Sequence, residues 1–151
     1  MKDVFNVKRS ADGDDVLKQL NGQYKNTITV IAADRVLEDV ESGSIVFCAI
    51  TGGTDINITL PTAAAGLHFT VINAVTPAGS GDAVIAPPVA DTLVSMSNGD
   101  ADADGISNLL ADSVTIEAAS VGGERIELVS DGTYWYSFAF QNVVGSITTT
   151  G

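Results

Sequence analysis

The amino-acid sequence predicts an all-β protein, an antiparallel β-sandwich or barrel that carries an extended N-terminal arm. From residue 26 onward, about ten short runs rich in Val, Ile, Thr and aromatic residues alternate with clusters of Gly, Pro, Asn and Asp, as strands joined by turns do. Hydrophobic residues make up 45% of the chain and charged residues 17%, which argues against a disordered chain and against a helical bundle.

The N-terminal residues differ from the rest and are predicted to form the arm. Val4, Phe5 and Val7 alternate only briefly, the basic Lys8 and Arg9 follow, and an Asp-rich stretch then breaks any regular pattern. One helical turn is expected after that stretch, because Asp is a favourable N-cap. We therefore divide the chain into an extended arm, residues 1–25, and a β-rich body, residues 26–151.

The body divides into predicted strands in chain order. Their sequences are ITVIA, RVLEDV, SIVFCAI, DINITL, LHFTVINAV, DAVIA, TLVSM, SVTIEAA, RIELVS and TYWYSFAF. The run from Ser44 to Ile50 is almost wholly apolar, which is typical of a strand buried on both faces, in a core or at a subunit contact. Residues 90–111 are expected to form a long loop with one short strand, and the final SITTTG a polar tail.

The stretch from Arg125 to Phe140 predicts a β-hairpin around Asp131-Gly132, a dipeptide that favours a two-residue type I′ turn. Such a turn pairs Leu128 with Trp135. Because side chains alternate across a strand, one face of the hairpin is expected to be core-like and the other to meet a neighbouring subunit or to be wet. That second face holds Val129, Glu127, Arg125, Tyr134, Tyr136 and Phe138.

The net charge of −12 is unevenly distributed. Residues 1–35 have a net charge of +1, whereas residues 36–151 hold 14 acidic residues and a single basic one, Arg125. An acidic body repels phosphate backbones, so we expect no nucleic-acid partner. The sequence shows no apolar run of the signal-peptide or membrane-spanning kind, so we expect a soluble protein made in a cytoplasm, without a membrane partner.

One motif suggests a metal. Asp100, Asp102 and Asp104, followed by Gly105, resemble the first half of a Ca²⁺-binding EF-hand loop. Ala111 stands where the bidentate Glu of such a loop is required, so we favour a solvated acidic loop over a Ca²⁺ site. No other cofactor is expected.

The remaining candidates do not suggest catalysis, and we expect no enzymatic activity. His68 is the only histidine, and no nucleophile or orienting acid is placed beside it by the sequence, so a surface or subunit contact is expected. Cys48 lies in an apolar run, which is typical of a buried, unreactive thiol. Arg125 either stacks on Phe138, its neighbour in the expected register, or pairs with an acid of another subunit, which we favour.

Several segments follow one another in an order that resembles a β-module of tailed-bacteriophage virion proteins, found in capsid decoration (cement), head-fibre and fibre proteins. These segments are ITLPTAAAGLHFTVINA, VIAP, DTL, DSVTIEA and IELVSDGTYWY. The residues that match are Leu60, Pro61, Gly66, Phe69, Asn73, Pro87, Asp91, Thr92, Asp131, Gly132, Thr133, Trp135 and Tyr136. The resemblance covers residues 45–138, and it implies a viral structural protein, usually a homotrimer, on the virion surface after synthesis in the host cytoplasm.

Taken with the arm, the resemblance leads us to expect a non-enzymatic decoration protein that binds the outer capsid surface and stabilises the shell. Its partners would be the major capsid protein and further copies of itself. Arg125 would contact another subunit, and the apolar and basic residues of the arm would contact the capsid or clasp a neighbouring subunit. The alternative is a receptor- or carbohydrate-binding module of a phage fibre or tail. In that case Tyr134, Tyr136 and Phe138 would stack on sugar rings.

Overall fold

The computed structural model describes residues 28–50, 53–74, 81–90, 92–98 and 110–150. These residues form eleven strands and one short 3-10 helix. In chain order the elements are β1 (Ile28–Ile31), β2 (Arg35–Val36), η1 (Asp39–Glu41), β3 (Ile45–Cys48), β4 (Ile56–Thr59), β5 (His68–Asn73), β6 (Ala83–Ala86), β7 (Leu93–Asn98), β8 (Ser113–Ile116), β9 (Arg125–Ser130), β10 (Trp135–Phe140) and β11 (Ile147–Thr150).

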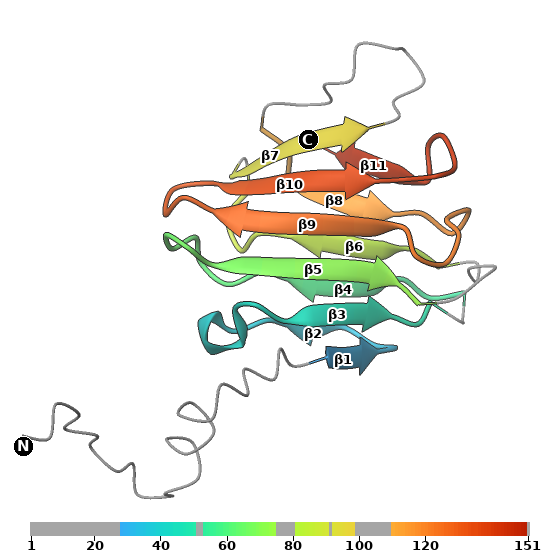
Figure 1. The fold of residues 1–151 in the computed structure, drawn as a ribbon, viewed down its shortest axis with the longest axis horizontal. Coiled ribbons are helices and arrows are strands. Elements are labelled where there is room, and N and C mark those ends of the chain that lie inside the picture. Colours follow the sequence, from blue (N-terminus) through green and yellow to red (C-terminus); the bar gives the residue numbers. More distant parts are fainter. Residues whose placement is uncertain (1–27, 51–52, 75–80, 91, 99–109, 151) are drawn as a thin grey trace, which may run out of the picture.

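The strands form two sheets that lie one over the other, the six-stranded sheet in front and the five-stranded sheet behind it in Figure 1. The strand order is β1-β3-β5-β9-β10-β7 in the six-stranded sheet and β11-β8-β6-β4-β2 in the five-stranded sheet. This arrangement confirms the predicted all-β sandwich.

Both sheets are mixed, whereas the sequence predicts antiparallel pairing. From β1 to β8 the chain alternates between the two sheets, so that β1, β3 and β5 pair in parallel, as do β2, β4 and β6. Parallel neighbours need a connection that returns the chain to its starting end. Here a strand of the opposite sheet provides that return, and the short turns on either side of it look the same in sequence as hairpin turns.

The core lies between the sheets and is lined by the inward residues of both. Trp135 and Phe69 are its largest side chains, with ring centroids 5.9 Å apart, and the indole Nε1 of Trp135 donates to the carbonyl oxygen of Pro61. Burial of such a ring stabilises the fold by about 1.5–3 kcal/mol. Cys48 is buried here as predicted, and burial raises the pKa of its thiol to about 12.

The predicted hairpin forms, but its register is shifted by two residues. Ser130 pairs with Trp135 and Leu128 with Ser137, so the connection has four residues instead of two. The carboxylate of Asp131 causes the difference, because its Oδ1 accepts hydrogen bonds from the backbone N–H groups of Thr133 and Tyr134 and widens the turn. An even shift leaves each side chain on its expected face, so the prediction of one core face and one mixed face is confirmed.

The apolar run from Ser44 to Ile50 contains β3 and buries Val46, Cys48 and Ile50 in the core, while Ile45 and Phe47 point outward and are half-buried. The outward side of β3 therefore lies outside the core of the chain, and the expected alternative, burial at a subunit contact, stays a prediction. Another expectation about the strands is wrong. The end of the chain, expected as a polar tail, forms β11 and pairs with β8 along the edge of the five-stranded sheet. Its Thr residues suit a strand, and Ile147 is buried in the core.

Candidate interaction surface

The outward face of the six-stranded sheet is built from alternate residues of its strands, which the register aligns in three rows. The first row holds Val30, Phe47, Ile72, Arg125 and Phe140. The second row holds Ile45, Thr70, Glu127 and Phe138. The third row holds His68, Val129, Tyr136 and Val94. We call these three rows the apolar face, because eight of their members are aliphatic or Phe residues.

Solvent reaches much of the apolar face. Val129 is 43% exposed, and Phe138 and Phe140 are each 38% exposed. Ile45 and Phe47 are half-buried. Six strands extend about 24 Å across the sheet at their usual spacing. An apolar patch of this extent is in the range of the largest patches on monomeric proteins, which are often sites of interaction.

Arg125 lies in the first row of the apolar face, at the start of the central strand β9. Its Nε donates to Oε1 of Glu127 over 3.0 Å, and its guanidinium lies 4.1 Å from the ring centroid of Phe140. The sequence left two alternatives, stacking on Phe138 and the favoured pairing with another subunit; the shifted register puts Phe140, not Phe138, opposite Arg125. Both members of the ion pair are about 40% exposed, so the pair adds at most about 1 kcal/mol to stability. The expected pairing of Arg125 with another subunit stays a prediction.

The end of the apolar face is closed by the β9–β10 turn. Besides accepting the two backbone N–H groups of the turn, Asp131 accepts a hydrogen bond from the hydroxyl of Tyr136 over 2.8 Å. The bonds from Tyr134 and Thr133 and from the Tyr136 hydroxyl hold the pKa of Asp131 below its ordinary value. The same carboxylate raises the pKa of Tyr136, because it favours the protonated hydroxyl. The Tyr136 ring is therefore held in one orientation.

The outward face of the five-stranded sheet has a different composition. Its residues are Val36, Thr59, Ala86, Asn57, Val84, Thr115, Thr148, Ser113 and Thr150. Several of its polar groups bond to one another or to neighbouring side chains: the hydroxyls of Ser113 and Thr150 lie 2.6 Å apart, and Thr148 donates to Glu117. We call this surface the polar face. Asn57, Ser113, Thr148 and Thr150 thus find partners within the chain.

Three aspartates that the sequence analysis did not single out fasten the five-stranded sheet at one end. Asp34 Oδ1 accepts the backbone N–H of Asn57 over 2.8 Å, Asp55 Oδ1 that of Asp82 over 3.0 Å, and Asp82 Oδ1 that of Ala118 over 2.7 Å. Each aspartate directly precedes β2, β4 or β6. An Asp one residue before successive apolar runs is the sequence signal that would have revealed them, and their role is structural.

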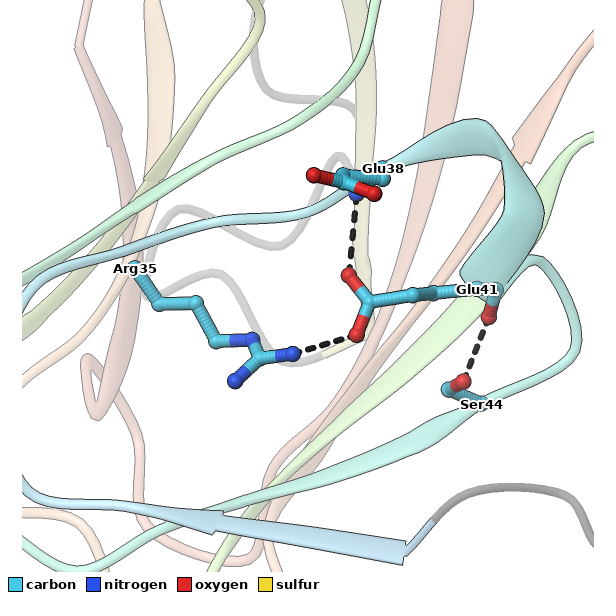
Figure 2. Close-up of polar contacts among 4 residues, drawn as sticks. All are labelled: Arg35, Glu38, Glu41 and Ser44. Atoms are coloured by element: carbon cyan, nitrogen blue, oxygen red, sulfur yellow. Dashed lines mark hydrogen bonds and ion pairs between the residues drawn. The ribbon is translucent and has the colours of Figure 1, made fainter.

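Arg35 is the other basic residue within the described ranges, and an acid of the same chain binds it. Its guanidinium donates to the carboxylate of Glu41, which also accepts the backbone N–H of Glu38 over 3.0 Å, while the Glu41 carbonyl accepts the hydroxyl of Ser44 (Figure 2). This network fixes the connection between β2 and β3. Arg35 is thus occupied at the edge of the sandwich.

Of the remaining predicted site residues, the structure describes His68. His68 is exposed in the third row of the apolar face, with Nδ1 3.3 Å from the carbonyl oxygen of Gly66, which agrees with the expected surface position. The arm residues Val4, Phe5, Val7, Lys8 and Arg9 lie outside the described residues, as do Asp100, Asp102 and Asp104.

In the described part of the chain, no three His, Cys, Asp or Glu side chains cluster closely enough to hold a metal ion. No helix in that part of the chain has the length and hydropathy needed to cross a membrane.

Comparison with protein-family models, with curated proteins and with solved structures gives no match for this chain. Any inference about function therefore depends on the chemistry of the apolar face.

Proposed function

We propose that this protein is a non-enzymatic structural protein of a tailed-phage virion, a capsid decoration protein that binds the outer surface of the shell and stabilises it. The observation that carries the proposal is the apolar face, which spans all six strands of one sheet. Such a surface suits a protein that acts by contact with other subunits. The resemblance of residues 45–138 to a virion β-module supports the same proposal.

In the proposed mechanism, the body and the arm have different roles. The body forms an oligomer, a homotrimer by analogy with the module, and each arm brings three apolar residues, Val4, Phe5 and Val7, to the major capsid protein. Several weak arm contacts on one oligomer add up to stable attachment, because later contacts form at high effective concentration. The acidic remainder of the body keeps neighbouring decorations apart and soluble.

The proposal is tested by the attachment of purified protein to capsids that lack it. We expect the full chain to bind and to raise the temperature at which the shells open. A variant without residues 1–25 should lose binding while keeping the β-sheet circular-dichroism spectrum of the full chain. Full occupancy by this variant would show that the arm does not attach the protein, and no binding by the full chain would refute the decoration role.

A receptor- or carbohydrate-binding module of a fibre or tail is the second candidate. It is favoured by the exposed rings of Phe138 and Phe140 and by the fixed ring of Tyr136, since sugars stack on such rings. Loss of glycan binding in Tyr136→Ala would support this function. The copy number per virion separates the two candidates, because decoration requires hundreds of copies and a fibre far fewer.

A further inference from the structure

We propose that the apolar face is covered by the apolar face of further copies of this chain, with Arg125 of one copy contacting Glu127 of the next. The inference takes from the proposed function only the expectation that copies associate, and it holds equally for a fibre module. In this arrangement the ion pair between Arg125 and Glu127 sets the register of two neighbouring copies.

The shape of the apolar face favours another sheet as its cover. The backbone groups of β3, β5, β9 and β10 are paired with neighbouring strands on both sides, so over these four strands the face offers only side chains, and the strand edges of the sheet belong to β1 and β7. An added strand therefore has no place on the central part of the face. Two sheet faces with interdigitating side chains pack about 10 Å apart, and each buries the other's apolar residues.

The distribution of charge favours a copy of the same chain. The apolar face carries one acid and one base, so two such faces meet without net repulsion. Outside this face, residues 36–151 contain 13 acidic residues and no Lys or Arg. Arg35, the other base in the described ranges, is bound to Glu41. Contacts between copies through these other surfaces would bring like charges together, which costs association free energy.

Arg125 is already held in the orientation that an intersubunit contact needs. Its guanidinium lies over the ring of Phe140, 4.1 Å from the centroid, and its Nε donates to Glu127. A guanidinium has further N–H donors, which a carboxylate of a second copy accepts. Because Glu127 lies beside Arg125 on every copy, the contact is reciprocal, and each copy offers both a donor and an acceptor.

The test is charge complementation in the full-length chain, measured by sedimentation velocity. Arg125→Glu places two acids on the face and Glu127→Arg two bases, so each variant alone should associate about tenfold or more weakly than the unmodified chain. An equimolar mixture should form mixed oligomers with near-original affinity, since opposite faces then meet. Native mass spectrometry distinguishes the two subunits by mass.

A pair of matched variants tests the apolar part of the argument. Val129→Glu introduces an acid on the apolar face, and Val36→Glu introduces the same acid on the polar face, where Val36 is 67% exposed. The first should dissociate the oligomer and the second should not.

The inference is wrong if the unmodified chain is monomeric, if the mixture of charge variants associates no better than each alone, or if Val129→Glu and Val36→Glu behave alike. A monomeric body that still attaches to capsids would overturn this inference and leave the proposed function standing.

Discussion

The two outer faces of the sandwich are both built from the outward residues of paired strands, but they differ in composition. On the polar face, the hydroxyl of Ser113 bonds to that of Thr150, and the hydroxyl of Thr148 donates to Glu117. On the apolar face, the corresponding positions hold Val129, Phe138 and others whose burial would require a partner. The polar face shows that this sandwich can form with a polar exterior, and this difference in composition supports the proposal that the apolar face contacts other subunits.

The largest expected effect on stability is the difference between variants on the inner and outer sides of one strand, β10. Trp135 and Phe138 both lie on β10, but Trp135 is buried in the core and Phe138 points outward. We expect Trp135→Ala to lower the free energy of unfolding by about 3–5 kcal/mol, because it leaves a cavity. Phe138→Ala should lower that of the monomer by less than about 1 kcal/mol. Chemical denaturation at low protein concentration measures both, and equal losses would remove the distinction between the faces.

A smaller effect is expected at two glutamates three positions apart. Glu124 is buried, and its Oε1 accepts the backbone N–H groups of Asn142 and Val143 over 2.7 and 2.8 Å, whereas Glu127 lies on the apolar face. Glu124→Ala should cost about 1–3 kcal/mol, because it leaves those partly buried donors without their acceptor. Glu127→Ala should cost less than about 1 kcal/mol. Thermal unfolding of both variants at neutral pH measures the difference.

The same glutamate predicts the acid sensitivity of the fold. Burial acts to raise the pKa of Glu124, but hydrogen bonds from Ser146, Val143, Asn142 and Val121 outweigh it and lower the pKa below the ordinary 4.5. A lowered native pKa stabilises the fold fully above the unfolded value, and this contribution is lost as the pH falls through the native value. Unfolding of the natural chain should therefore become easier below pH 4.5, with a shallower dependence in Glu124→Gln. Identical pH profiles would rule out this role.

The smallest effect concerns the turn at the end of the apolar face. Hydrogen bonds from the turn and from Tyr136 lower the pKa of Asp131, and that carboxylate raises the pKa of Tyr136. In Tyr136→Phe the pKa of Asp131 should rise toward its ordinary value, and in Asp131→Asn the pKa of Tyr136 should fall toward 10.0. Titrations followed by carboxyl NMR and by tyrosine absorbance test the pair. An unchanged pKa in either variant would mean that the two side chains do not interact in solution.

The sequence was sufficient to predict side-chain faces but not strand partners. Alternation from Arg125 to Phe140 correctly separated the core residues from the outward ones, and the apolar run around Cys48 correctly predicted a buried thiol. The register failed because a side chain, the Asp131 carboxylate, sets the length of the turn. Parallel pairing could not be predicted, because alternation and turn residues are the same whichever sheet the next strand joins.

The sequence predicted only the part of the candidate site that lies within one hairpin. The outward residues of the hairpin were identified as a mixed face, but the rows that continue it through Phe47 and Ile72 depend on pairing between distant segments. A pattern of alternation within one strand does not show which strands lie beside it. The full extent of the apolar face therefore appears only in the folded chain.

The central claim, that copies of this chain cover the apolar face, is tested most directly by hydroxyl-radical footprinting of the unmodified protein over a range of concentrations. Phe138 and Phe140 should become protected as the concentration rises, while Val36 on the polar face should be oxidised at the same rate throughout. Oxidation of Phe138 and Phe140 that does not change with concentration, in a protein that nevertheless associates, would contradict the account.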